Sequence, residues 1–221
     1  MAALLQNACA ARAQAAICWA RDVDDFDLEP FITAGAQHAD TQVRLLTARL
    51  AFQRQLFTER FDNDHSVAVR RLRFDAAVAA QDKDVVIGVL TDTSRSLRAD
   101  ALFFVKKWKV DVDLDVVFSV AVLSLTSGRR RAAGVSGLGM IRSARLADMK
   151  HLLDDRVPRV RAAAILALAD ADLLSAEEAW TAFVDDARSV SRAACVVFAE
   201  HPALAPEADA LLGVIDDERP H

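Results

Sequence analysis

Pairs of oppositely charged residues return along this chain at a regular spacing, and the chemistry they offer is guanidinium–carboxylate pairing. An Asp is followed five residues later by an aliphatic residue and then at once by an Arg. A carboxylate accepts two parallel N–H bonds from an Arg side chain, so the two residue types can form an ion pair. The members of this Asp–Arg ladder are Asp64, Arg70, Asp92, Arg98, Asp155, Arg161, Asp185 and Arg192.

Three repeats depart from this pattern. In the first, Asp40 stands too close to Val43-Arg44, and the fourth has Leu125 where the others have Asp. The sixth has Ser191 in the Arg position, with Arg192 one place late. We therefore expect the ladder to be interrupted at the fourth and sixth repeats.

The period of the pattern predicts a helical repeat protein. The aliphatic position falls at residues 43, 69, 97, 130, 160 and 190, in steps of 26 to 33 residues, and in the fourth repeat it holds Arg130. Such self-similarity is typical of solenoids. Small or aliphatic residues follow three, four, seven and eight places later, which is one stripe of an α-helix. We expect an all-α fold, an α-solenoid of about six stacked helix pairs.

The chain between these positions alternates short and long helices. A short helix begins at Leu28-Glu29-Pro30 and a long one near Thr41. Ser175 and Glu178 form a predicted capping box. The later pairs are expected at 53–61 with 65–80, 83–91 with 94–108, 112–125 with 128–142, 145–154 with 157–170, and 176–185 with 187–200.

The whole chain, 1–221, is expected to be a single solenoid. Residues 1–27 form an N-terminal capping helix and an acidic turn, 28–200 the helix-pair repeats, and 201–221 a C-terminal half-repeat with a helix over 207–215. The closing Asp216-Asp217 resembles Asp154-Asp155, so the chain ends where another second helix would begin. A fragment of a longer array and a natural half-repeat both remain open.

Composition favours a cytoplasmic protein. Three cysteines without paired spacing, and no secretory signal, indicate a reducing compartment. The apolar first 20 residues are interrupted by Arg12 and lack a preceding basic residue, so we expect no membrane segment.

The Asp-to-Val-Arg pattern, with the preceding Leu28-Glu29-Pro30-Phe31, resembles HEAT repeats, particularly the short bacterial class with periods near 30. The resemblance covers about residues 28–221. It implies a right-handed solenoid whose second helices line a concave surface that binds partners, in a family that is mostly non-catalytic. From the residues alone, we expect each ladder Asp to cap N–H groups at the start of a second helix and to pair with an Arg of its own or an adjacent repeat.

Charge and register give the candidate partner-binding residues. Residues 121–162 hold nine basic and three acidic side chains, whereas 163–221 hold three and twelve. The column six places after the aliphatic position begins charged and becomes apolar, which suits a protein segment better than a nucleic acid. Solvated helix faces, helix C-capping by lysines and packing between helices are the alternative interpretations. The candidates are Arg49, Phe103, Lys107, Arg129, Arg130, Arg131 and Leu166.

No constellation predicts a catalytic residue, a cofactor or a metal. The five histidines lie in different repeats, without zinc-ligand spacing. Asp22 to Asp27, and separately Asp111, Asp113 and Asp115, match part of a calcium-loop spacing but lack its Gly and closing Glu. Gly134, Gly137 and Gly139 do not form a dinucleotide fingerprint, and close helix packing explains them better.

Two functions remain. The first is a non-enzymatic scaffold or adaptor for a protein or peptide, with self-association through open solenoid ends as a further possibility. The second is a HEAT-like nucleic-acid-binding protein, similar to the DNA base-excision glycosylases. A net charge of −5 and three widely separated tryptophans argue against the second.

The ladder predicts that Asp155→Ala lowers the free energy of unfolding by about 1–2 kcal/mol, through loss of turn hydrogen bonds and an Arg partner. Thermal and urea denaturation measure the change. An unchanged melting midpoint would contradict a structural role for the ladder.

Overall fold

The computed structural model describes residues 5, 9–23, 27–56 and 59–207, and these are helices and their connections with no strand among them. Two compact units share the chain, Met1–Val89 and Leu90–His221. Each is described here by itself. No helix within the described ranges is both long and apolar enough to cross a membrane.

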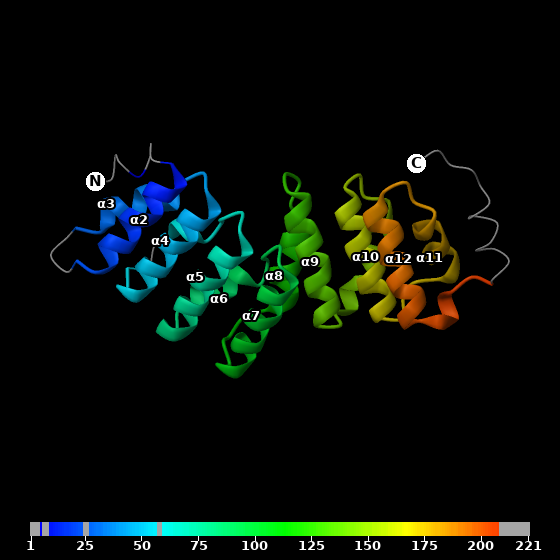
Figure 1. Ribbon diagram of the computed structural model, residues 1–221. Coiled ribbons are helices and arrows are strands. Elements are labelled where there is room, and N and C mark those ends of the chain that lie inside the picture. The colour runs from blue at the N-terminus through cyan, green and yellow to red at the C-terminus, as the bar shows by residue number, and fades with distance from the viewer. Residues whose placement is uncertain (1–4, 6–8, 24–26, 57–58, 208–221) are drawn as a thin grey trace. The chain divides into compact units, whose positions relative to one another are not determined.

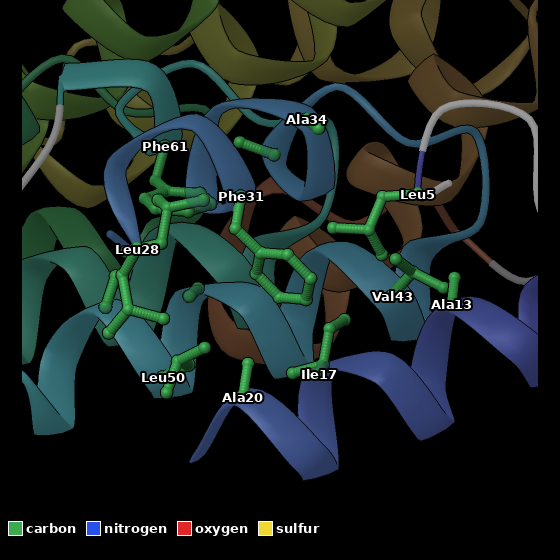
Figure 2. Packing of buried hydrophobic residues seen from close by; sticks show 14 of the residues in the cluster. Leu5, Ala13, Ile17, Ala20, Leu28, Phe31, Ala34, Val43, Leu50 and Phe61 are labelled. Carbon is green, nitrogen blue, oxygen red and sulfur yellow. The ribbon is translucent and has the colours of Figure 1, made fainter. Parts of the chain in front are cut away.

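Unit 1 is a stack of helices around an apolar core (Figure 1). α4 packs against α2, α3 and α5, and α5 packs against α6. Phe31, Ile17, Val43, Leu50 and Phe61 converge between these helices (Figure 2). The elements are α2 Ala10–Arg21, α3 Glu29–Ala36, α4 Thr41–Gln53, the 3₁₀ turn η1 Glu59–Phe61, α5 Val67–Ala80 and α6 Lys83–Val89.

Unit 2 continues with short and long helices in alternation. α9 packs against α8 and α10, and α10 packs against η2 and α12, which in turn contacts α11. The long helices α9, α10 and α12 therefore follow one another side by side (Figure 1). The elements are α7 Arg95–Lys107, α8 Leu114–Val122, α9 Gly128–Met140, η2 Ala144–Asp154, α10 Pro158–Asp170, α11 Ala176–Phe183, α12 Arg188–Glu200 and η3 Pro202–Leu204.

Two expected first helices take a different form. In the segment at 53–61, the described residues are the end of α4 at Gln53, a turn over 54–56 and the 3₁₀ turn η1. The segment at 145–154 is η2, an 11-residue 3₁₀ helix. Its apolar side chains Leu146, Met149 and Leu152 recur every third residue, which matches three residues per 3₁₀ turn. The predicted helix at 207–215 lies almost wholly outside the described residues.

Five of the long helices end in the same way, and no residue type in the sequence indicates it. Gln55, Gln81, Lys109, Arg142 and Asp172 have φ between 51° and 58°, each twelve residues after the aliphatic position. The N–H of the following residue then bonds a carbonyl of the last helical turn, as from Ser143 N to Leu138 O at 3.0 Å. This is the Schellman arrangement. Because none of the five residues is Gly, the usual sequence signal is missing.

Close approach of α8 to α9 explains two glycines. A Cβ built on Gly134 would lie 2.6 Å from Phe118 O and 2.7 Å from Val122 N, which are backbone atoms of α8. A Cβ on Gly137 would overlap the Phe118 ring. The prediction that these glycines serve helix packing is confirmed, and the capping box of Ser175 with Glu178 is also present.

Gly134→Ala should lower the free energy of unfolding by about 1–3 kcal/mol, because the backbone of α8 must move away from the new methyl group. Gly88→Ala on α6 is the control, since no atom other than those of its chain neighbours and of the adjacent α6 backbone lies within 4 Å of its Cβ position. The control should be more stable by up to about 1 kcal/mol, through helix propensity alone. Urea denaturation measures both. Equal midpoints for the two variants would contradict the packing argument.

Candidate functional site

Guanidinium–carboxylate pairs join consecutive repeats, and we call each such pair an Arg–Asp joint. Arg131 donates from Nε and Nη2 to the two carboxylate oxygens of Asp155, both at 3.0 Å. Arg161 donates in the same way to Asp185, at 2.9 and 2.8 Å. Each Arg thus pairs with the Asp of the following repeat rather than with that of its own.

The third nitrogen of each Arg holds the turn of its own repeat. Arg161 Nη1 donates to Asp155 O at 2.8 Å, and Arg131 Nη1 to Ser124 O at 2.9 Å. Arg70 Nη1 donates to Asp64 O at 2.5 Å. One guanidinium therefore connects two turns, one through backbone oxygen and one through carboxylate oxygen.

The ladder Asp fixes its turn instead of capping the helix, which corrects the expectation from sequence. Asp155 Oδ1 accepts from Val157 N at 2.8 Å, and Asp185 Oδ1 from Ala187 N at 2.8 Å. Val157 and Ala187 are themselves the N-cap residues of α10 and α12. The Asp lies two residues before the cap, so it forms an Asx turn that sets the direction from which the chain enters the helix.

These contacts act on the carboxyl groups of the joints. The hydrogen bond from Arg161 lowers the pKa of Asp185, against the opposing effect of burial. At Asp155, burial alone would raise the pKa, but hydrogen bonds from Arg131 and from Val157 N outweigh it, and the pKa is lowered. Both carboxyl groups are therefore stabilised as carboxylates in the folded protein.

The first repeat also has a joint, although its sequence lacks the Asp. Arg44 donates to Asp64 from Nε at 2.7 Å and from Nη2 at 3.2 Å. In the Asp position stands His38, whose Nδ1 accepts from Asp40 N at 3.0 Å and so takes over the turn bond. Asp40 is free to cap α4 through Gln42 N and Val43 N. The spacing of Asp40 shows that the first repeat departs from the pattern. It does not show that His38 accepts the turn bond while Asp40 caps α4.

The sixth repeat has no Arg in its joint position. Arg192 is exposed and forms no ion pair or hydrogen bond with any described side chain. One residue later in an α-helix means a rotation of about 100°, so this Arg points away from the turn that Arg161 serves. Arg192 was counted as a member of the ladder, and that assignment is wrong, whereas the interruption expected from Ser191 is present.

The fourth repeat leaves a buried Arg without its carboxylate. Arg98 is only 5 % exposed, and its Nη1 donates to Asp92 O at 2.6 Å. The Asp of the following repeat would stand at position 125, where Leu125 is 83 % exposed. Arg98 Nε is buried and has no hydrogen-bond partner among the described residues. Burial lowers the pKa of the Arg98 guanidinium, and the charge of Asp92 offsets this only in part.

The seven partner-binding candidates are differently placed. Arg49, Phe103, Lys107, Arg129 and Arg130 are exposed, and Leu166 is half-buried. Lys107 Nζ lies 5.7 Å from the centre of the Phe103 ring, within cation–π range.

Arg131 is the exception among these candidates. It is buried and committed to Asp155, so it cannot also present its guanidinium to a partner. The basic run at 129–131 therefore offers two exposed cations, not three.

Exposed apolar side chains gather in α7, in α8 and in the turn that follows α8. Val116, Val120 and Leu123 stand four and three residues apart and form one stripe of α8. Phe103 is 58 % exposed and Leu125 continues the series beyond the helix. We call Val116, Val120 and Leu123 the α8 stripe. These three residues are not among the candidates taken from the sequence.

Acidic groups elsewhere have structural partners. Asp113 caps α8 through Val116 N at 3.0 Å, and Asp115 accepts from Ser143 Oγ, so these two do not converge as calcium ligands. Asp24 and Asp25 lie outside the described residues.

One cluster with metal-ligand chemistry escaped the sequence search. Asp170, Glu200 and His201 bring ligand atoms within 4.8 Å of one another at the ends of α10 and α12. The carboxylates are exposed, and His201 Nε2 lies 3.9 Å from Asp170 Oδ1, the separation of a loose surface ion pair. The two helices belong to different repeats, so no linear spacing indicated the cluster.

The helix pairs and their joints define an all-helical protein of packed repeats with an exposed apolar surface. No protein-family model and no curated protein matches the chain.

Asp185→Asn removes the ion pair with Arg161 but keeps the Asx turn, because the amide oxygen can still accept from Ala187 N. At neutral pH it should lower the free energy of unfolding by about 1–2 kcal/mol. The folded pKa of Asp185 lies below the unfolded value of 3.8. The stabilisation of the folded state by the Asp185 carboxylate is therefore complete above pH 3.8. It is lost as the pH falls through the folded pKa of Asp185.

Urea denaturation of both proteins between pH 2.5 and 7 measures this difference, which should narrow in acid. In an Arg161→Gln background the same substitution should cost less and show little dependence on pH. A constant difference across the pH range would contradict the joint.

Proposed function

We propose that this protein is a non-enzymatic scaffold that binds a segment of a partner protein, and that its helix pairs stack as a right-handed α-solenoid of the HEAT type. The segment would lie along the concave face lined by the long helices and would also reach the short helix α8, whose exposed stripe lies outside that face. In unit 2, Phe103 and Val196 occupy the same register on α7 and α12 and are exposed, and Ser136 and Leu166 at that register are half-buried. If neighbouring repeats covered this face of the helices, these side chains would be buried.

The observation that carries a protein partner is the exposed apolar surface of unit 2. Phe103, the α8 stripe and Leu125 are between 45 % and 83 % exposed within a stretch of 23 residues. Single exposed apolar residues are ordinary on a soluble protein, but five within 23 residues favour an interaction surface in this part of unit 2. Burying such side chains against a partner supplies the main favourable free energy of association.

The same surface disfavours the nucleic-acid alternative. Binding to a phosphate backbone depends on cations clustered on one face. Of the three consecutive arginines, Arg131 is already neutralised by Asp155, and Lys107 lies over the Phe103 ring. Within residues 103–125, five large apolar side chains are exposed beside three exposed lysines, which fits a peptide with apolar anchors.

Panning a displayed random-peptide library on the immobilised protein tests the proposal. We expect enriched peptides with apolar residues, whose affinity falls at least about tenfold for Phe103→Asp or Leu123→Asp, because each removes exposed apolar contact area. Both side chains are exposed, so the substitutions should leave the melting midpoint nearly unchanged.

Val67→Asp, at an exposed apolar position of α5 in unit 1, is the matched control and should bind normally. Failure to enrich peptides, or equal binding by all variants, would argue against the scaffold. Salt-sensitive micromolar binding to duplex DNA would instead favour the nucleic-acid alternative.

A further inference from the structure

Arg98 occupies the Arg position of a joint whose Asp carboxylate is missing. At the two complete joints of unit 2, a guanidinium uses Nε and Nη2 on a carboxylate and Nη1 on a backbone carbonyl. Arg98 has the backbone bond, to Asp92 O, and nothing described accepts from its Nε. A buried cation without its anion is costly, since burial weakens hydration and no ion pair replaces it.

The register identifies what is missing. α7, α9, α10 and α12 begin after the N-cap residues Ser94, Ser127, Val157 and Ala187, and the joint Asp precedes the cap by two residues. Before α9 that position holds Leu125. A Leu side chain has no oxygen to accept the Nε–H bond, and at 83 % exposure most of it lies in solvent.

The turn around Leu125 is also less firmly fixed than its counterparts. Asp92, Asp155 and Asp185 each accept from the N–H two residues on, at 2.6 to 2.8 Å. Leu125 cannot form this Asx bond. An incoming group would reach Arg98 by displacing this turn, which is held by Arg131 Nη1 at Ser124 O and has one hydrogen bond fewer than its counterparts.

We propose that Arg98 receives a carboxylate from the bound protein segment, an Asp or Glu side chain that takes the place of the missing joint Asp. This assignment rests on the scaffold function proposed above and specifies its ligand chemistry. The segment would carry apolar residues for Leu123 and Leu125, and one acidic residue for Arg98. The planar fork of an Arg side chain matches a carboxylate in two parallel hydrogen bonds, as three joints of this protein already do.

Leu125→Asp places the missing carboxylate within the chain and should compete with the partner. Leu125→Asn is the matched control, because it has the same size and turn-forming ability without the charge. We expect Leu125→Asp to raise the melting midpoint above that of the control and to weaken binding of the peptides enriched on the wild type by about tenfold or more. Leu125→Asn loses only the apolar contact of Leu125, so it should weaken binding clearly less than Leu125→Asp does.

The Nε–H resonance of Arg98 in ¹⁵N NMR reports the bond directly, and Arg98→Lys assigns it. Sodium acetate is the free-carboxylate probe, with sodium chloride at equal ionic strength as its control and inorganic phosphate as the competing anion. We expect a saturable shift with acetate, a larger one with peptide, and a resonance in Leu125→Asp that is shifted already and insensitive to acetate. Peptides whose acidic residues are replaced by amides should bind about tenfold more weakly or worse.

The outcomes separate the two proposals. Peptides that bind through Leu123 but are unaffected by amide replacement or by Leu125→Asp would overturn the role of Arg98 and leave the scaffold intact. A resonance that responds to phosphate and not to acetate would also overturn it, in favour of a phosphorylated ligand. Absence of any peptide that depends on Phe103 or Leu123 would remove the scaffold proposal, and the assignment of Arg98 with it.

Discussion

The bond between a guanidinium in one repeat and a carboxylate in the next is the constraint on which the arrangement of the turns depends. Hydrophobic stripes bring helices together, but apolar contact is non-directional and tolerates sliding. The joint adds direction, because one planar group must satisfy a carbonyl in its own turn and two oxygens in the following turn. Arg161 meets all three requirements between Asp155 and Asp185. Each Asx turn then sets where the next long helix begins.

Much of this could be predicted from the sequence, because the residues involved are chemically distinctive and recur in register. The helix pairs followed from apolar spacing, and the pairing of Asp with Arg followed from charge. The direction of the pairing did not, since both an Asp of the same repeat and one of the next satisfy the linear spacing. Only the fold places Asp185, and not Asp155, opposite Arg161 Nε.

Other features could not be recognised from the sequence. His38 replaces a turn Asp through a ring nitrogen, a substitution that no motif anticipates. The left-handed residues Gln55 and Asp172 end helices where Gly would be expected. Arg131, counted with its neighbours as a basic run, belongs to a joint because its environment and not its type decides its partner. Position 125 was recognised as a departure, yet its effect on Arg98 appears only once burial is known.

The 3₁₀ conformation of η2 determines how far, in ångströms, the first helical segment of its repeat extends. At about 2.0 Å of rise per residue its 11 residues extend roughly 22 Å, whereas 13 residues of α10 at about 1.5 Å extend roughly 20 Å. The shorter segment thus spans the full length of its longer partner. The same 11 residues wound as an α-helix would extend roughly 16 Å, about 3 Å less than α10, and would turn Leu146, Met149 and Leu152 off a common line. A repeat can therefore lose residues from its first helix and still keep its height.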